Sequence, residues 1–253
     1  MTTYGSDAAA WFYVDGYQVA GVVTHLEDSE EAAAEDNGGL GENVGRVGFV
    51  GETSAEVQHD GFFDDAAASV IAALDPAGGG ALGAQHTLLY AIAGNAIGRS
   101  CVLARGALEA NFKKLVERSK FTKANCAYKV NTSLDTARVV LHRVARTSAG
   151  NSDATSVDNG AASANGGVAV LEVDALALGG YTNLAVTMRD SADNVTFAAI
   201  AGGSAFPLVT VVNTSAVLTI AGAIRRYASA AWAYGGAGSG PTWTGVVALV
   251  RNP

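Results

Sequence analysis

Cysteine and proline are scarce in this chain of 253 residues, which contains two cysteines and four prolines. Cys101 and Cys126 provide neither a disulfide framework nor the spacing of a metal site, which excludes the disulfide-rich secreted classes. A run of about 18 apolar residues is also lacking, and this excludes a membrane-spanning helix. Because the N-terminus lacks a charged segment followed by an apolar one, we expect no signal peptide and synthesis in a reducing cytoplasm.

Basic residues are almost missing from the first part of the chain. Residues 1–74 contain fourteen acids and one base, Arg46, whereas residues 75–150 contain eleven bases and four acids. The net charge of the whole chain is −8. A single charge is ordinarily interpreted as part of a solvated face. A reversal of net charge this large between neighbouring segments instead suits subunits that dock an acidic surface against a basic surface. The acidic surplus argues against stationary binding of nucleic acid, which requires clustered Lys and Arg.

Motifs of catalysis and of ligand binding are lacking as well. The segment Gly38-Gly39-Leu40-Gly41 has no following Lys-Ser/Thr pair of a phosphate loop. Asp190, Asp193 and Asn194 have the spacing of a calcium turn, but a capped turn is the simpler interpretation. The four histidines have no second metal ligand nearby, and no nucleophile elbow accompanies the His59-Asp60 pair; these histidines are His25, His59, His86 and His142. We therefore predict no catalytic residue, no cofactor and no metal.

The residues that are present favour a mainly β fold. Glycine is abundant, with 31 residues, and 49% of the chain is apolar, which suits many short strands and turns. Asp15-Gly16 predicts a tight hairpin turn. In the stretch Glu52–Gln58, Thr53, Ala55 and Val57 alternate with Glu52, Ser54, Glu56 and Gln58, which predicts a strand with one wet face. Phe121–Val130 predicts another strand, with Cys126 and Tyr128 pointing inward. Further strands are predicted at Ala10–Val14, Tyr17–Thr24, Thr87–Ala93, Cys101–Leu108 and Ala137–Ala145.

One helix and one loop are predicted between these strands. Asp64 and Asp65 can cap a helix whose apolar stripe is Ala67, Val70, Ile71 and Leu74. Pro76 and the glycines after it end this helix. The acidic stretch Glu27–Asn43 is interpreted as a long mobile loop that orders on a partner, or as a short exposed helix at Ser29–Asp36.

The composition changes at Thr147 and suggests a domain boundary. Residues 147–167 hold almost only small and polar side chains, as a linker or surface arm does. Beyond this segment, seven short strands separated by glycine turns predict an all-β sandwich with Tyr227, Trp232 and Trp243 in its core or rim. The predicted domains are therefore 1–146, a linker at 147–167 and a sandwich at 168–253. The seven strands are expected at Val168–Val173, Leu184–Met188, Phe197–Ile200, Leu208–Val212, Ala216–Ile220, Tyr227–Trp232 and Val246–Val250.

Several long stretches resemble one protein family. SAEVQHDGFFDDAAASVIAAL, TLLYAIAG and VLARGALEANFKKLVERSKFTKANCAYKVN resemble the tail tube, or major tail, proteins of siphovirus-type bacteriophages of actinobacterial hosts. The later stretches SVDNGAASANGGVAVLEVDALALGGYTNLAVTMRDSADNVTF and IRRYASAAW resemble the immunoglobulin-like sandwich domain that often follows in such proteins. The resemblance implies a polymerising tail tube domain that forms a β-sandwich or barrel with one short α-helix, and a decorating C-terminal sandwich.

The resemblance also implies a virion function and a set of partners. Family members form hexameric rings that stack helically into a tube, through which DNA passes without specific binding. Other partners would be the tape measure, terminator and distal tail proteins, and no membrane is involved. Within this expectation, Glu52, Ser54, Glu56 and Gln58 are predicted to face the lumen. Inter-subunit contacts are predicted for an acidic and a basic group of residues: Glu27, Glu30, Glu31 and Glu35, and Lys113, Lys114, Arg118 and Lys120.

Other classes of function remain as alternatives. A carbohydrate-binding virion protein would use Tyr227, Trp232 or Trp243 as sugar-stacking platforms. A capsid-decorating protein would bind phage heads instead of forming tubes. An enzyme is the least favoured class, since no active site is assigned.

Overall fold

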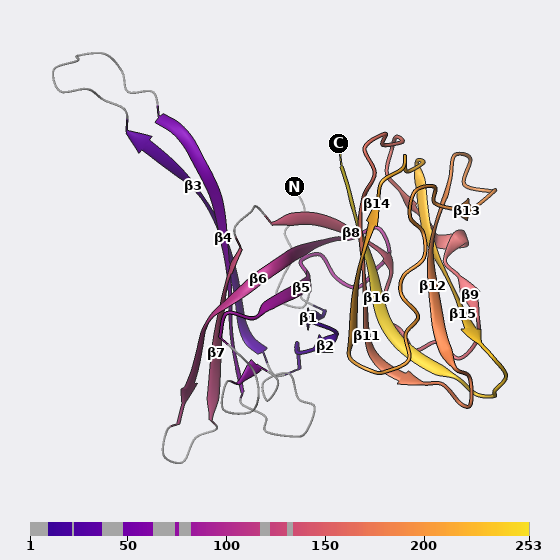
Figure 1. Ribbon diagram of the computed structural model, residues 1–253, viewed down its shortest axis with the longest axis horizontal. Helices are drawn as coiled ribbons and strands as arrows, with labels where there is room; N and C mark the ends of the chain where they lie inside the picture. The colour runs from indigo at the N-terminus through magenta and orange to yellow at the C-terminus, as the bar shows by residue number, and fades with distance from the viewer. Residues whose placement is uncertain are drawn as a thin grey trace. The chain divides into compact units, whose positions relative to one another are not determined.

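The computed structural model describes residues 10–21, 23–36, 48–62, 74–75, 82–116, 122–130 and 134–252. The chain is mainly β, as predicted, and its strands are shown in Figure 1. The described residues contain no helix long and apolar enough to cross a membrane. The strands are β1 Phe12–Val14, β2 Tyr17–Gln18, β3 Val23–Asp36, β4 Gly48–Phe62, β5 Gln85–Ala91, β6 Ser100–Leu115, β7 Lys123–Val130, β8 Asp135–Leu141, β9 Gly150–Asn151, β10 Val157–Asp158, β11 Gly167–Ala177, β12 Asn183–Ser191, β13 Ala198–Ala199, β14 Thr214–Ile220, β15 Tyr227–Gly235 and β16 Thr242–Arg251, with a 3-10 turn η2 at Asp153–Thr155.

The chain divides into two compact units, and the boundaries differ from the predicted domains. Unit 1 comprises Met1–Ala20, Leu89–Leu103 and Thr136–Pro253, and unit 2 comprises Gly21–Leu88 and Ala104–Asp135. Unit 1 therefore combines the ends of the chain with a central segment. A boundary predicted from a composition change could not reveal this, because composition reports on neighbours in the sequence and not on long-range pairing.

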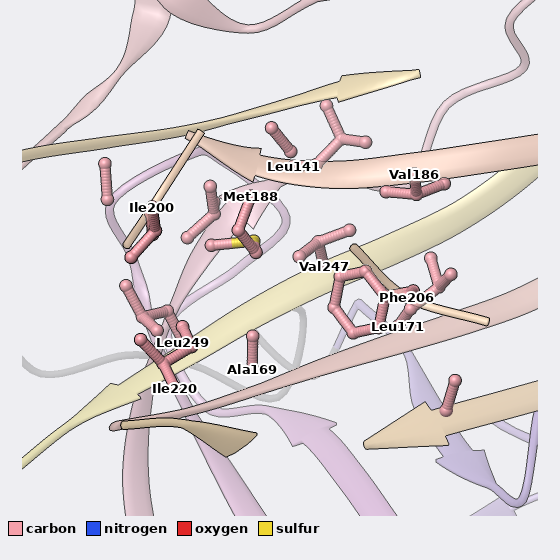
Figure 2. Packing of buried hydrophobic residues seen from close by; sticks show 14 of the residues in the cluster. Leu141, Ala169, Leu171, Val186, Met188, Ile200, Phe206, Ile220, Val247 and Leu249 are labelled. Carbon is pink, nitrogen blue, oxygen red and sulfur yellow. The ribbon is translucent and has the colours of Figure 1, made fainter. Parts of the chain in front are cut away.

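Unit 1 contains a two-sheet sandwich, as predicted for the C-terminal part. One layer is formed by β14-β11-β16-β8, which belong to a larger sheet that continues through β6, β5, β1 and β2, and the other sheet has the order β10-β15-β12-β13 with β9 beside β15. A core of buried side chains fills the space between the sheets, and Figure 2 shows Leu171 and Val247 from one sheet and Val186 and Met188 from the other. Burial of such side chains contributes on the order of 2 kcal/mol each.

A second core of unit 1 lies on the other face of the same central strands. Val168 and Val170 of β11 and Ala248 of β16 pack there with Trp11 and Tyr13. Hydrogen bonds hold this N-terminal segment in place. The Tyr13 hydroxyl donates to Asp174 Oδ1 at 2.7 Å, and Arg143 Nη2 donates to Asp174 Oδ2 at 2.6 Å. Burial beside the Asp174 carboxylate raises the pKa of Tyr13, so its hydroxyl stays protonated and keeps donating.

The N-terminal hairpin of unit 1 forms at the predicted turn, but its second strand, predicted at Tyr17–Thr24, ends at Gln18. β1 and β2 are antiparallel, with Val14 opposite Tyr17. The turn residues Asp15 and Gly16 have φ angles of 48° and 88°, the left-handed conformation that Asp-Gly turns of this type require. The carboxyl group of Glu172 is fully buried and accepts bonds from the Gly16 backbone and from Ser215 Oγ, the latter at 2.9 Å. Burial raises the pKa of Glu172 well above its ordinary value.

Unit 2 is built on a sheet in which β4 lies between β3 and β7, and β7 lies between β4 and β6. β3 and β4 form a long antiparallel ribbon (Figure 1), and the register pairs Glu27 with Gln58 and Glu31 with Ser54. β7 follows its predicted alternation, because Ala124, Cys126 and Tyr128 are buried while Lys123 and Lys129 are exposed. Both cysteines are free and buried, which for Cys126 agrees with its predicted inward position.

Several sequence predictions are corrected by this fold. The predicted loop or helix at Glu27–Asn43 is wrong for residues 27–36, which belong to β3; residues 37–47 lie outside the described residues. The acids of β3 suggested a loop, but an edge strand tolerates them because its side chains reach water. The predicted linker 147–167 carries β9, η2 and β10, which pair with or lie against β15. The predicted strand Leu208–Val212 is reduced to an isolated bridge between Val209 and Leu184.

The predicted helix lies mostly outside the described residues. Only its last residue, Leu74, is described, and it is helical and 2% exposed. The strand predicted at Cys101–Leu108 is longer than expected, since β6 continues to Leu115 and includes Lys113 and Lys114.

Candidate functional site

Strand β4 presents the two different faces that its sequence predicts. Ala55 and Val57 are 3% and 0% exposed, and His59 is also fully buried. Ser54, which precedes them, is exposed, and Glu56 and Gln58, which lie between them, are partly exposed. Glu52 belongs to the same strand, but its side chain lies outside the described set. The wet face of β4 is thus observed, whereas its position in an assembly stays a prediction.

The register extends this wet face over four strands, which we call the polar face. Residues directly opposite each other in a ladder share one face, so Glu56 shares it with Lys129, and Asp60 with Asn125. On the outer strands, Glu27 lies opposite Gln58 and Lys113 lies opposite Asn125. The polar face is acidic on β3 and β4 and basic on β7 and β6. Its polar members are His25, Glu27, Ser29, Glu31, Ser54, Glu56, Gln58, Asp60, Asn111, Lys113, Lys123, Asn125 and Lys129.

Contacts across the polar face are few and exposed. Lys129 Nζ forms an ion pair with Glu56 Oε2. Asn125 Nδ2 donates to Asp60 Oδ1 at 2.5 Å. Because the Glu56 and Lys129 side chains are 34% and 56% exposed, their attraction is screened and contributes little to stability. These contacts orient side chains without neutralising the acidic strands.

A shallow hollow of about 450 Å³ lies on the polar face. Its polar lining includes Gln58, Asp60, Asn111, Lys113 and Lys123. The hollow combines one carboxylate with two ammonium groups, and no nucleophile with an adjacent base is among these residues. Such a surface can receive charged side chains, but it provides no arrangement for acid–base chemistry.

The predicted inter-subunit residues are divided between the two faces of this sheet. Glu27, Glu31 and Lys113 lie on the polar face, whereas Glu30 lies on the other. Glu30 Oε1 accepts a bond from the Leu134 backbone N–H at 2.5 Å.

Lys114 is also on the other face and forms an ion pair with Asp75 of its own chain. Glu35 is in β3, but its side chain is outside the described set, and Arg118 and Lys120 are outside the described residues. Among the described side chains, the predicted charges are divided between the two faces, and their role between subunits stays a prediction.

A buried polar cluster lies beneath the polar face and was not predicted from the sequence. His59 Nε2 is 3.3 Å from the Tyr128 hydroxyl, and the two rings stack at 5.8 Å between centroids. His86 Nε2 is 3.4 Å from Glu109 Oε2, and the Glu109 side chain is fully buried. Burial lowers the pKa of His59 to about 4 and raises the pKa of Glu109. The inward phase of Tyr128 was the one available sequence signal, because His86 and Glu109 sit in stretches without clean alternation.

Of the three aromatic residues that the carbohydrate-binding alternative names, burial excludes Trp243. Trp243 is fully buried in the core. The Arg146 guanidinium lies 4.8 Å from the Trp243 ring centroid and 5.1 Å from that of Trp232. Trp232 Nε1 donates to the Ser148 carbonyl at 2.7 Å, and Tyr227 stacks with Arg226 at 5.0 Å. These rings are engaged by neighbouring groups, and Trp243 is unavailable to a ligand.

The candidate calcium turn is a capped turn. Asp193 Oδ1 accepts bonds from the backbone N–H groups of Val195 and Thr196, both at 2.9 Å. The same oxygen is 2.7 Å from Ser191 Oγ, and Asn194 has a φ of 61°. These bonds hold the pKa of Asp193 down at about 2. Over the described ranges, no group of three or more His, Cys, Asp or Glu side chains is placed to hold a metal ion.

Comparisons with known proteins identify no family, because no protein-family model and no curated protein matches the chain. Two of the similar solved structures are of gene transfer agent particles. One, described as the virion of a native gene transfer agent particle, is 14% identical over 53% of this chain and 98% of that chain, with a TM-score of 0.41. Another, the tail of an empty gene transfer agent particle with C6 symmetry, is 14% identical over 52% and 97%, with a TM-score of 0.40.

A crystal structure of the SPP1 Dit protein, described as a paradigm of the hub adsorption apparatus in phages that infect Gram-positive bacteria, is also similar. It is 10% identical over 96% of this chain and 99% of that chain, with a TM-score of 0.32. Similarity at these levels concerns the fold alone and assigns no function.

Proposed function

We propose that this protein is a structural subunit of a phage-type tail, in which copies assemble as hexameric rings stacked into a tube that conducts DNA. The sequence resemblance to tail tube proteins motivates the proposal. The observation that carries it is the open edge of β3. This strand of 14 residues pairs with β4, and no second strand covers its outer edge within the described residues.

An edge of this length is unusual for a protein that stays monomeric. Its unpaired N–H and C=O groups form a template on which another strand can add. The acids of β3 discourage pairing with arbitrary partners, because an added strand must tolerate or neutralise them. Closure of a ring by strands of neighbouring copies would remove the edge from every subunit at once.

The polar face gives the proposal an orientation. We place it toward the lumen, so that Ser54, Glu56 and Gln58, together with Glu52, line the channel. Glu27 and Glu31 then join them, because they lie on the same face. A wall with this acidic surplus repels phosphates, which favours passage of DNA over adhesion. The three lysines of β7 and β6 lie on the same face, and they reduce its acidic surplus without removing it.

Electron microscopy of the purified full-length protein tests the proposal directly. Negatively stained samples are expected to contain open-ended tubes of uniform diameter, which grow as the protein concentration rises. A protein that stays monomeric at every concentration and ionic strength up to its solubility limit would contradict the proposal.

Two neighbouring proline variants test the role of the β3 edge. Adjacent residues of a strand direct their N–H groups to opposite sides, so in Ser29→Pro and Glu30→Pro one variant loses a bond to β4 and the other loses a donor on the open edge. The variant that loses the donor on the open edge should keep the melting temperature of the wild type, because its bonds to β4 are intact. It should nevertheless form no tubes. Tubes formed by both variants would exclude β3 as the joining edge.

A further inference from the structure

Two arginines border a hollow at one end of the sandwich in unit 1. The hollow measures about 190 Å³ and is lined by Thr136 and Arg138 of β8, Leu249 and Arg251 of β16, and Asn159 after β10. The register places Arg138 directly opposite Leu249. Because side chains alternate along a strand, Thr136, Arg138, Leu249 and Arg251 share the sheet face that carries the sandwich core.

The two guanidinium groups have more N–H donors than the acceptors around them use. Arg251 Nη2 donates to the Ala161 carbonyl at 2.7 Å, and its Nη1 lies 3.5 Å from the Asn159 carbonyl. Arg251 Nε is buried and has no acceptor in the described part of the chain. Arg138 Nη1 has one distant acceptor, the Gly98 carbonyl at 3.4 Å. The hollow is therefore rich in donors and poor in acceptors.

The charges at this hollow are also unbalanced. Burial and the nearby charge of Arg138 lower the pKa of Arg251. Asp158 interacts electrostatically with Arg138, but its two carboxylate oxygens accept hydrogen bonds from Arg226 at 2.7 and 2.6 Å. No ion pair joins Arg138 or Arg251 to an acid over the described residues. Two positive charges held close together repel each other, and an anion bound between them would offset this repulsion.

We propose that this hollow binds a phosphate-type oxyanion between Arg138 and Arg251, with the Thr136 hydroxyl as a further donor. Guanidinium groups bind oxyanions through paired N–H···O bonds. A tetrahedral anion offers oxygens in several directions and can serve both arginines and the hydroxyl, which suits donors from different strands better than the coplanar oxygens of a carboxylate do. The anion can be free phosphate or the phosphodiester of a larger molecule. The site is independent of the proposed tail function.

Calorimetric titration of the full-length protein tests this site. Inorganic phosphate and diethyl phosphate are titrated separately at constant ionic strength, with chloride as the reference anion. Saturable binding of phosphate alone would indicate a free-anion site, and binding of both would indicate a site for phosphodiesters. In Arg138→Gln the dissociation constant for phosphate should rise by about tenfold or more, as the loss of one charge-assisted contact predicts.

Matched variants separate this site from general charge effects. Arg105→Gln removes the same charge from an exposed arginine of unit 2 that pairs with Asp135, and it should leave the phosphate affinity unchanged. Thr136→Val should weaken binding by a smaller factor without altering the charge. Equal heats for phosphate and chloride, or equal phosphate affinity in the wild type and Arg138→Gln, would overturn the proposal. A melting curve without phosphate verifies that each variant is folded.

Discussion

His59 is a buried base whose neutral form the fold requires. Its ring stacks on Tyr128 and is fully buried, and its pKa is lowered from 6.5 to about 4. The unfolded chain therefore binds more protons than the folded chain between these two pKa values. Stability is lost as the pH falls from the unfolded pKa of His59 to its folded pKa, and the loss amounts to roughly 3 kcal/mol.

Denaturant unfolding at several pH values tests this expectation. The unfolding free energy of the wild type should fall between about pH 6.5 and about pH 4, and His59→Gln should flatten this fall. Glu109 acts in the opposite direction, because a raised carboxyl pKa stabilises the fold as the pH decreases. The difference between the two proteins isolates the histidine. An identical pH dependence in both would show that His59 does not titrate in this way.

At the scale of the element, β3 places its acids alternately on two faces. Glu27 and Glu31 are on the polar face, and Asp28 and Glu30 are on the opposite face. If the polar face lines a channel, Glu27→Lys with Glu31→Lys gives its wall a cationic stripe. Assembled tubes of this variant should then retain DNA when sedimented, and wild-type tubes should not.

The matched control reverses the same number of charges on the same strand. Asp28→Lys with Glu30→Lys should not increase retention of DNA, because these side chains are on the other face. Glu30 also bonds to the Leu134 backbone, so the melting temperature of this control is measured first. Equal retention by both variants would place the channel elsewhere.

The same element shows where prediction from sequence succeeds and where it fails. The alternation around Ala55 and Val57 identified β4 and its wet face, because one buried face imposes a period of two. β3 has no buried face, since its described side chains are exposed or only partly buried. Its acidic composition was therefore interpreted as that of a loop. The Glu109–His86 pair was missed for a related reason: the burial of a carboxylate depends on a partner distant in sequence.

At the scale of the whole molecule, the two compact units cross the boundary predicted at residue 146. Val168 and Val170 of β11 and Val246 and Ala248 of β16 share a core with Trp11. A chain that ends at residue 146 loses these four residues, along with most of the sandwich core. Such a chain should fail to fold unit 1, and the loss exceeds the total stability of an ordinary domain.

Circular dichroism and hydrogen exchange of the truncated chain test this outcome. The truncated chain should lack cooperative melting of unit 1 and should exchange the amides of β8 rapidly. A chain that ends at Arg251 is the control, since it keeps β16 complete. Cooperative melting and slow exchange in the chain ending at 146 would show instead that the N-terminal segments are stable without the sandwich.

The place of β16 in unit 1 has a consequence for biosynthesis. This strand follows all the other strands of unit 1 in sequence, yet it lies between β11 and β8 and contributes to the cores on both sides of its sheet. The ribosome therefore releases β16 after every other strand of unit 1. Unit 1 can close only once β16 has left the ribosome, and a product terminated before β16 cannot acquire the native surface of unit 1.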